Sequence, residues 1–410
     1  MTVASLVRST LALRRHRVVR VRDIGGKIVV ELDVIKGRHQ PCAACGLFGG
    51  VRDRLKERRW RHVPVWGIAC ELRYRPARID CEGCGKRKVE AIPWSAGKSP
   101  IAQPLIIVLA TWSRLLAWDV VAKLFGVSWS TVVGAVESAV AYGEARRDLS
   151  GVSLIGVDEL SRRKGHVYHT NVYDLSTGRL LWSGEGRAEA TLEAFFDWFG
   201  PENTAKLVGV CCDMWAPYVD VITLRAGHAT LVFDRFHIMA NLLRALDEVR
   251  RAEQREIKHA NPGLLKGLRY ALLKNPGKLT AWEQQRLAEL EANFTLKTLR
   301  AWALKEMLRH LWTYKRKAYA RRFLDLWFHR ATHSKLQPIR KFAWMLRRHY
   351  DGILAWFDLP ISNGLAEAMN NNAKAISHRA RGYRSAKAFR LSMLHCLGGL
   401  QLPETVHRFG

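Results

Sequence analysis

The chain has 410 residues, 48% of them hydrophobic, so we expect roughly two to four domains of about 100 to 200 residues each. Its 66 Lys and Arg against 37 Asp and Glu give a formal net charge of +29. This excess of positive charge indicates a polyanionic partner, because the commonest reason for such an excess is to neutralise the phosphates of a bound nucleic acid. No apolar run approaches the length of a membrane span, and residues 1–20 contain no secretion signal, so we expect a cytoplasmic protein with no membrane partner.

Two cysteine pairs of identical spacing mark the predicted first domain, residues 1–95. A predicted hairpin, with strands at 18–21 and 27–34, leads into the first pair. The four sulfurs belong to Cys42, Cys45, Cys81 and Cys84, and a glycine follows each pair. Because two intervening residues let both sulfurs of a pair enter one tetrahedron, we predict a structural zinc site and not disulfides. The alternative is four unrelated buried thiols. Cys70 has no mate and is expected in the core.

The same domain carries a basic stretch, residues 56–62, around Trp60. Arg58, Arg59 and Arg61 are candidates for phosphate contact, because basic side chains interleaved with an aromatic ring suit a nucleic-acid surface. A solvated basic face explains this stretch equally well.

Residues 96–149 are predicted as a helical domain. Apolar residues recur at helical spacing over 105–116, and a further apolar helix leads through Gly126 to a serine cap at Ser128. This outline is typical of a helix-turn-helix, whose second helix would bring Ser128, Trp129 and Ser130 to a DNA groove. An ordinary pair of packed helices is the alternative, because these positions are not strongly basic.

The pattern over residues 150–240 predicts an α/β arrangement. Three antiparallel strands come first, then a helix, a strand, a helix and a strand; the strands are expected at 152–158, 167–173, 179–182, 207–212 and 229–233. Asp158, Asp213 and Asp234 stand at strand ends, where ligands and metals collect in such sheets. Asp213 and Asp234 also precede helices, so a helix cap is the alternative for each. The order of elements resembles the RNase H-like fold, in which such acids hold metal ions at adjacent strand ends.

A third carboxylate follows a predicted all-helical insertion, residues 241–354. Its segments Trp302–Trp312 and Phe323–Trp327 supply apolar faces, and we expect the tryptophans of these segments to pack in its core. The segment 355–395 then returns to the catalytic domain, and residues 396–410 form a tail. On the predicted helix of this segment, Glu367, Asn370, Asn371 and Lys374 share one face.

A basic patch around Tyr383 suits phosphate contact, and its arginines are Arg379, Arg381 and Arg384.

These motifs follow one another in an order that resembles the DDE transposases of bacterial insertion sequences. The segments that carry the resemblance, besides the cysteine pairs and the helix-turn-helix, are Gly156–Glu159, Arg163–His166, Cys212–Tyr218, Asp234–His237, and Asn363–Glu367 with Asn370 and Asn371. The match is to the branch with an N-terminal four-cysteine zinc domain, the ISL-three family, and covers the chain from about Cys42 to Arg390. Ala43 stands where that family has Pro, a change that leaves the ligands intact.

The resemblance implies a multidomain α/β protein, with an RNase H-like mixed sheet and a helical insertion preceded by a small zinc-binding domain and a helix-turn-helix. It implies that Asp158, Asp213 and Glu367 hold two catalytic Mg²⁺ ions, with Zn²⁺ as a structural ion. The implied transposase binds the terminal inverted repeats of an insertion sequence, cleaves the DNA ends and joins 3′-hydroxyls to target DNA, as a homodimer on double-stranded DNA. The alternatives are an RNase H-like nuclease or resolvase without strand transfer, and a catalytically inert DNA-binding regulator. Asp234 has three open roles: helix cap, assistance to the metals, or orientation of His237.

Overall fold

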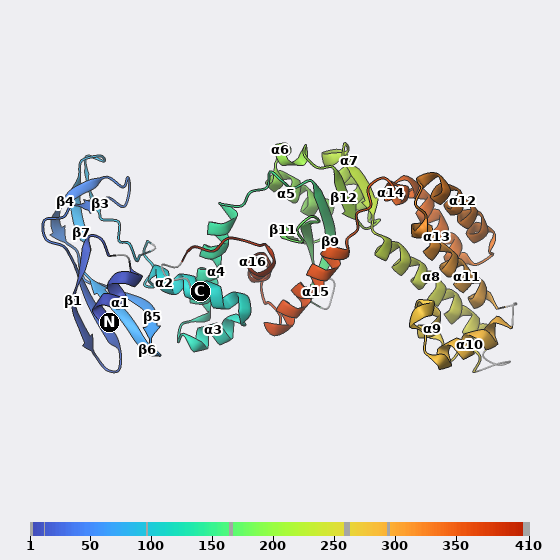
Figure 1. The fold of residues 1–410 in the computed structure, drawn as a ribbon, viewed down its shortest axis with the longest axis horizontal. Coiled ribbons are helices and arrows are strands. Elements are labelled where there is room, and N and C mark those ends of the chain that lie inside the picture. The colour runs from blue at the N-terminus through green and yellow to red at the C-terminus, as the bar shows by residue number, and fades with distance from the viewer. Residues whose placement is uncertain are drawn as a thin grey trace. The chain divides into compact units, whose positions relative to one another are not determined.

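The fold is described from a computed structural model, drawn in Figure 1, which covers residues 3–11, 13–95, 97–163, 167–257, 263–292 and 296–404. The chain divides into two compact units. The first consists of Met1–Arg147 with Ala375–Gly410, and the second of Asp148–Lys374.

Two four-stranded sheets make up the N-terminal part of the first unit, after α1 (Val3–Thr10). One sheet has the order β1 (His16–Asp23), β2 (Ile28–Val34), β6 (Ile68–Tyr74), β5 (Arg58–Val65). The other has the order β3 (Gln40–Pro41), β4 (Phe48–Arg54), β7 (Ala77–Cys81), β8 (Lys86–Val89). Strands β1 and β2 pair antiparallel, which confirms the predicted hairpin, and Gly25 and Gly26 in its turn have φ of 61° and 71°. Such positive φ values favour glycine.

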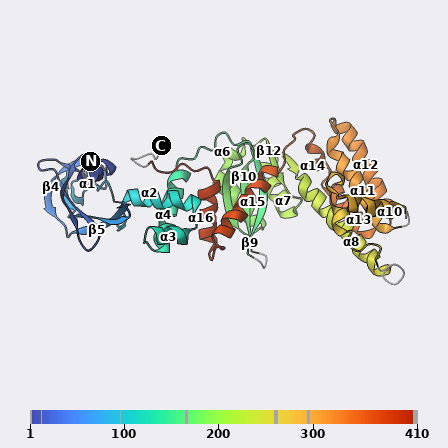
Figure 2. The ribbon, with the colours of Figure 1, turned by 60° about the horizontal axis from the view of Figure 1, so that its bottom comes forward.

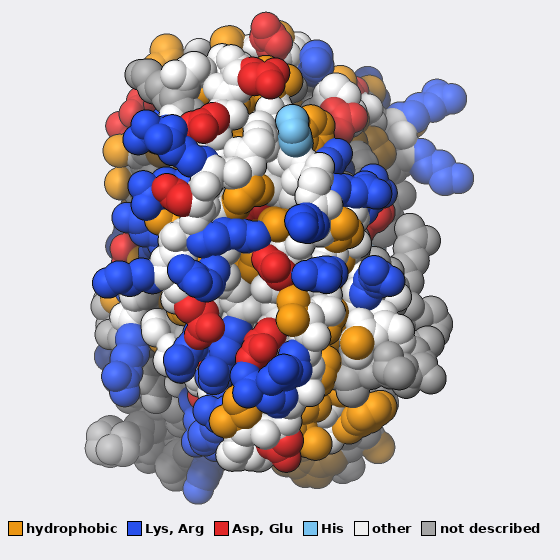
Figure 3. Space-filling model, turned by 90° about the vertical axis from the view of Figure 1, so that its left-hand side faces the viewer, with side chains coloured by type: hydrophobic (Ala, Val, Ile, Leu, Met, Phe, Trp, Pro, Cys, Tyr) orange, Lys and Arg blue, Asp and Glu red, His pale blue; other side chains and the backbone are white. Residues whose placement is uncertain are grey.

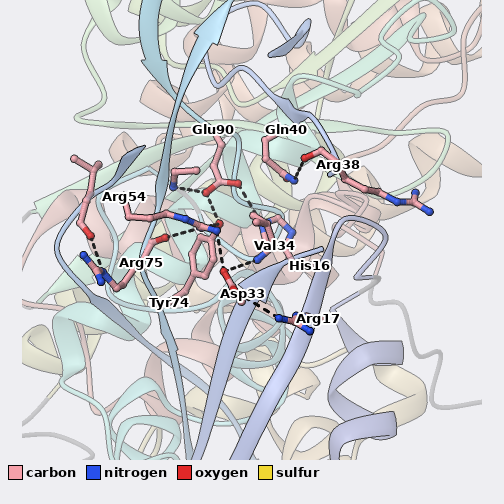
Figure 4. Close-up of polar contacts among 12 residues, drawn as sticks. His16, Arg17, Asp33, Val34, Arg38, Gln40, Arg54, Tyr74, Arg75 and Glu90 are labelled. Carbon is pink, nitrogen blue, oxygen red and sulfur yellow. Dashed lines mark hydrogen bonds and ion pairs between the residues drawn. The ribbon is translucent and has the colours of Figure 1, made fainter. Parts of the chain in front are cut away.

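A buried carboxylate, Glu90, joins the two sheets (Figure 4). Its oxygens accept hydrogen bonds from the Tyr74 hydroxyl of β6 (2.5 Å) and the Ala77 N–H of β7 (2.6 Å). A third contact runs to His16 Nε2 of β1 (3.2 Å). Arg54 of β4 adds a second link between the sheets through its ion pair with Asp33 of β2 (2.8 Å). Because a buried charge is tolerated only when hydrogen-bonded, this cluster fixes how the sheets meet.

Four helices complete the first unit: α2 (Gln103–Leu115), α3 (Trp118–Leu124), α4 (Trp129–Glu144) and α16 (Ala386–Leu397). The predicted helix pair is present as α3 and α4, whose axes meet at 112° across a turn in which Gly126 has φ of 58°. The hydroxyl of Ser128 accepts from the Thr131 N–H (3.2 Å) and caps α4, as predicted. Within the described ranges no single helix is long and apolar enough to cross a membrane; only the bent pair α3 and α4 passes that test together.

The second unit is built on a five-stranded sheet with the order β11 (Leu180–Glu185), β10 (Val167–Asp174), β9 (Leu154–Arg163), β12 (Gly209–Cys212), β13 (Thr230–Phe233). Strand β10 pairs antiparallel with both β9 and β11, and β12 runs parallel to both β9 and β13. All five strands lie close to the predicted positions. The prediction that Asp158 ends its strand is wrong, because β9 continues to Arg163 by pairing with β10 beyond the point where β12 stops.

Helices α5 (Glu189–Phe199), α6 (Pro201–Thr204) and α7 (Ala216–Ala226) accompany the sheet. The predicted apolar face of α5 is confirmed, since Leu192, Phe195, Phe196 and Phe199 are all buried. These aromatic side chains and the strand residues Val157 and Val172 belong to one hydrophobic core.

After β13 the described chain is helical up to residue 355. Its elements are α8 (Arg235–Glu256), α9 (Arg269–Leu273), η1 (Pro276–Lys278), α10 (Ala281–Glu291), α11 (Lys297–Arg309), η2 (His310–Thr313), α12 (Lys317–His333), α13 (Gln337–Arg348) and α14 (Tyr350–Ala355). Trp312 and Trp327 are buried here, as the packing interpretation predicted, and the Trp327 indole N–H donates to the Leu304 carbonyl (2.8 Å).

Helix α15 (Gly364–Arg379) runs beside β9 in both Figure 1 and Figure 2. The division between the two units falls inside it, after Lys374. Helix α16 packs with α2 and α4, and its His395 Nε2 lies 2.7 Å from the Ala110 carbonyl oxygen. The domain boundaries expected from the sequence do not anticipate this return of the C-terminal segment.

Candidate active site and cysteine cluster

The register of the central strands brings three aspartates level with one another. Cys211 of β12 pairs with Gly156 of β9, so two further residues along each strand put Asp213 level with Asp158. Cys212 pairs with Phe233 of β13, so one further residue puts Asp213 level with Asp234. Because the strands are parallel, all three side chains emerge at the same edge of the sheet.

Asp158 is held by hydrogen bonds to both of its carboxylate oxygens. Its Oδ1 accepts from the Glu159 N–H (2.8 Å), and its Oδ2 accepts from the side-chain amide of Asn370 on α15 (2.6 Å). The ring of His237, on the first turn of α8, places Nε2 3.7 Å from Asp158 Oδ1 and 3.9 Å from Asp234 Oδ2. The side chain of Asp158 is therefore oriented by groups from three different elements.

Asn370 is itself fixed by two residues of β10. Its Oδ1 accepts from the Tyr173 hydroxyl (2.5 Å) and from the Asn171 side-chain amide (3.2 Å). Asn171 lies directly opposite Asp158 in the strand pairing, and Asn370, Tyr173 and Asn171 are all buried. The sequence interpretation did not assign a role to Asn171 or Tyr173. The available signal was an asparagine in the middle of a central strand, because a buried amide requires partners.

Helix α15 is attached to β9 at a second point. The Asn363 side-chain amide donates to the Val157 carbonyl (3.0 Å), and a Cβ on Gly156 would lie 2.5 Å from Asn363 Oδ1. A side chain at position 156 would therefore displace the Asn363 amide, and glycine leaves room for it. Glu367 lies between the contacts made by residues 363 and 370 and, at helical spacing, shares their side of α15. Its side chain is partly exposed.

Burial and neighbouring charges raise the pKa values of several acids in this cluster. Burial raises the pKa of Asp213, and the charge of Asp158 raises it further, against the opposing effect of His237. Burial, followed by the charge of Asp213, also raises the pKa of Glu159. The hydrogen bond to Asp158 raises the pKa of His237. The carboxylates thus repel one another, and a bound cation would relieve that repulsion.

The three predicted catalytic acids do not yet form a closed metal site. Among the described residues, one group of three or more possible ligands has all its ligand atoms within 4.8 Å of one another, and that group is the four cysteines. Asp213 Oδ1 accepts from the Trp215 N–H (3.0 Å). Asp234 occupies the N-cap position of α8 without a side-chain capping hydrogen bond. Carboxylate oxygens are nevertheless the ligands that hard divalent cations prefer, so the residues fit Mg²⁺ chemically.

The four cysteines converge as predicted. The Sγ atoms of Cys42 and Cys84 are 4.0 Å apart, and those of Cys45 and Cys81 are 3.4 Å apart. A tetrahedron with Zn–S bonds of about 2.3 Å has edges of roughly 3.8 Å, so the sulfurs fit a zinc ion. The Ala44 N–H donates to Cys42 Sγ (3.4 Å) and is the largest cause that lowers the pKa of Cys42 to about 7.

The glycines after each cysteine pair adopt the positive φ expected of a zinc knuckle. Gly46 has φ of 76° and Gly85 has φ of 60°. Their N–H groups close the turns onto the Cys42 and Cys81 carbonyls at 2.9 and 3.0 Å. Cys70 is buried away from this cluster, as predicted.

The basic candidates of the N-terminal part are found on β5. The Arg58 guanidinium lies over the Trp60 ring (4.6 Å to the centroid), and Arg59 pairs with Glu57 (3.5 Å). The Arg61 guanidinium lies 3.4 Å from where a Cβ on Gly126 would stand, next to the turn between α3 and α4. Figure 3 views the side that carries β1, β3 and β4 and shows Lys and Arg side chains spread across it with fewer Asp and Glu.

At the start of α4, Ser128 and Ser130 share a hydrogen bond between their hydroxyls (2.8 Å). Trp129 leaves 50% of its surface exposed and packs partly against Trp118, with ring centroids 6.0 Å apart. Ser128 is therefore occupied by capping, whereas the Trp129 ring remains available to a ligand.

The basic residues around the end of α15 have mixed roles. Lys374 is exposed and contacts Asn371 Oδ1 (3.3 Å), and Arg381 and Arg384 are exposed. Arg379 donates to the Leu115 carbonyl (2.8 Å) at the end of α2, a contact that stabilises the helix terminus. The motif Arg163–His166 lies outside the described residues, except for the backbone of Arg163.

Comparison with known proteins gives consistent matches over most of the chain. A family profile described as Transposase, of the ISL3 DDE type, matches residues 155–393. The transposase for insertion sequence element IS1001 of Bordetella parapertussis is 30% identical over 356 residues, which are 86% of this chain and 87% of that protein. The transposase for insertion sequence element IS1557 of Mycobacterium tuberculosis is 30% identical over 400 residues, which are 91% of this chain and 89% of that protein.

Proposed function

Because this chain belongs to the ISL3-type family of DDE transposases, we propose that it binds the terminal inverted repeats of an insertion sequence, cleaves the DNA at those ends and joins the 3′-hydroxyls to target DNA. The observation that carries the proposal is the placement of Asp213 level with Asp158, with α15 bonded to β9 at Val157 and Asp158. We infer that Glu367, at helical spacing from Asn363 and Asn370, lies on the side of α15 that faces the same edge of the sheet.

The catalytic unit is proposed to be RNase H-like. Three antiparallel strands followed by two parallel strands, in the order β11-β10-β9-β12-β13, support this assignment. So does the position of Asp158 and Asp213 on neighbouring strands, because acids at adjacent strand ends are the feature that this fold uses to hold metal ions. The helical elements α8 to α14 would then be an insertion before the helix that supplies Glu367.

Asp158, Asp213 and Glu367 are proposed to hold two Mg²⁺ ions, which when bound activate the attacking hydroxyl and stabilise the departing oxygen in phosphodiester chemistry. Asn370 would fix the rotamer of Asp158, because its amide donates to Oδ2 while Tyr173 and Asn171 hold its own oxygen. Among the described residues these carboxylates do not form a group of ligand atoms within 4.8 Å of one another, and bound metal and DNA would draw them closer. His237, between Asp158 and Asp234, balances negative charge until then.

Recognition of the element ends is proposed to use the four-cysteine part, with Zn²⁺ as its structural ion, together with the α3–α4 pair. Arg58, Arg59 and Arg61 would contact phosphates, and Ser128, Trp129 and Ser130 would approach a groove. Lys374, Arg379, Arg381 and Arg384 would contact the DNA near the cleavage point. Because two ends must be cut and joined together, the active form is proposed to be a homodimer on DNA.

The decisive test mixes the purified chain with double-stranded DNA that carries the element's end, a supercoiled target plasmid and Mg²⁺. We expect nicking at the element boundary and covalent joining of the end to the plasmid. Nicking without joined products would favour a nuclease or resolvase. Binding of the ends with no cut under any divalent ion would favour an inert DNA-binding regulator.

A further inference from the structure

An exposed tryptophan lies directly beside the proposed catalytic edge. Trp215 is two residues after Asp213, and its backbone N–H donates to the Asp213 carboxylate (3.0 Å). Its indole N–H donates to the Arg187 carbonyl (3.3 Å), so the ring's one polar atom has a partner. The side chain nevertheless leaves 40% of its surface exposed. The ring is therefore fixed in orientation and keeps apolar surface in solvent next to Asp213.

The Arg187 side chain faces this ring. The Arg187 guanidinium lies 5.3 Å from the Trp215 centroid and 4.6 Å from the Tyr168 centroid. It also pairs with Glu159 (3.7 Å), the residue after Asp158. Arg187 thus connects the tryptophan to the strand that carries the first catalytic aspartate, and its planar group extends the stacking surface.

A hollow of about 570 Å³ opens over this surface, between Arg187, Trp215, Pro217 and the start of α5. Its volume falls within the range of about 300–1,000 Å³ that small-ligand sites occupy. Glu189 and Glu193 of α5 also line it. Two carboxylates repel a phosphate, but they accept hydrogen bonds from the exocyclic amines and ring N–H groups of a nucleobase. The lining therefore favours the flat, uncharged part of a nucleotide.

We propose that this hollow binds one unpaired nucleobase of the element-end DNA, stacked on Trp215 and Arg187, while the neighbouring phosphate lies at Asp158 and Asp213. The proposal rests on the proposed function, since it needs DNA at the carboxylate edge. Extrusion of a base beside the cleavage point would fix the position of the phosphate along the strand. No covalent step is involved.

The test is a binding measurement that does not depend on cleavage. Wild-type protein and Trp215→Ala are titrated, with Ca²⁺ in place of Mg²⁺, against fully paired end DNA and against ends that carry a single mismatch at successive positions around the boundary. A mismatch removes the cost of unpairing, so wild type should bind one mismatched end about tenfold more tightly than the paired end. Trp215→Ala should lose that preference, and Trp215→Phe should keep most of it.

Trp282→Ala is the matched control, because that side chain is 55% exposed on α10, away from the hollow, and it should retain the mismatch preference. An equal preference in wild type and Trp215→Ala would overturn the proposal. So would a Glu189→Gln, Glu193→Gln double variant that binds paired and mismatched ends more tightly by the same factor, since that result indicates a phosphate in the hollow. If the mismatch preference is present but no DNA is ever cut, the stacking site stands and the proposed function fails.

Discussion

The four-cysteine cluster and the carboxylate site differ in how completely the fold assembles them. All four sulfurs already lie within 4.8 Å of one another, in tight turns closed by their own backbone. At the proposed carboxylate site Asp158 accepts hydrogen bonds on both oxygens, but among the described residues its acids do not form a group of ligand atoms within 4.8 Å of one another. A structural zinc site is closed and exists to hold the fold, whereas Mg²⁺ keeps waters and completes its shell with substrate phosphates. We therefore interpret the closed cysteine cluster as the proposed structural zinc site, and the more open carboxylates as the proposed Mg²⁺ site that substrate phosphates would complete.

The largest expected effect comes from removing a carboxylate of the incomplete site. Asp213→Asn should lower the initial rate of end cleavage by about 1,000-fold or more, because a metal ligand is lost and the stabilisation of the transition state with it. End binding should be unchanged, as measured by gel shift in Ca²⁺. Asp220→Asn, an exposed aspartate on α7, should cleave normally. Equal cleavage rates for these two variants would remove Asp213 from the active site.

The complementary change breaks the closed site. We expect metal analysis to find one zinc ion per wild-type chain and none in Cys81→Ser, because a thiolate ligand is lost. End binding should weaken by about 100-fold, because the local fold depends on the metal. A zinc chelator added to wild type should reproduce the binding defect. Cys70→Ala, a change at a buried cysteine outside the cluster, should retain zinc. Normal end binding by zinc-free protein would contradict this assignment.

The Asn370→Ala variant tests whether the Asp158 carboxylate is oriented before metal and DNA bind. Asn370→Ala removes the amide that holds Asp158 Oδ2, and we expect cleavage to fall by about 10- to 100-fold at fixed Mg²⁺. The Mg²⁺ concentration for half-maximal rate should rise, a shift that simple loss of stability would not produce. Asn371→Ala, at the exposed neighbouring position, should behave as wild type. An unchanged Mg²⁺ dependence would mean that Asn370 only packs.

The smallest expected effect concerns the close approach of α15 to β9. Gly156→Ala places a Cβ 2.5 Å from Asn363 Oδ1 and 2.6 Å from Leu175 Cδ2, so it should lower the free energy of unfolding by about 1–3 kcal/mol in urea titration. Gly134→Ala on α4 meets no atom within 4 Å and should leave stability unchanged or raise it slightly. If both substitutions have the same effect, the contact does not constrain the helix.

Local patterns predicted the elements well and their contacts poorly. The strands around Asp158, Asp213 and Asp234 were predictable because apolar runs and turn residues are near neighbours in sequence. The cysteine cluster was predictable because the spacing within each pair sets where its sulfurs point. The bonds from Asn370 to Asn171 and Tyr173 were not, because they cross 199 and 197 residues and depend on how α15 packs.

Register is the other property that sequence patterns leave open. The extension of β9 past Asp158 depends on its pairing with β10, the next described strand in the chain. The second N-terminal sheet was not predicted either, because its strands are short. Its order, β3-β4-β7-β8, pairs β4 with β7, and β5 and β6 of the other sheet lie between these two strands in the sequence. The buried polar cluster around Glu90 likewise unites residues 16, 74, 77 and 90.

The polar cluster around Glu90 links the cysteine cluster to β1. Glu90 pairs by a β-bridge with Cys42, one of the sulfur ligands, and its side chain reaches β1 through His16. Withdrawal of the proposed zinc ion would therefore loosen the strand that carries exposed Arg17, Arg20 and Arg22, while the second unit contains none of the four clustered cysteines. We expect zinc depletion to block transposition at the step of end recognition. The catalytic unit would stay folded but would not be brought to the element ends.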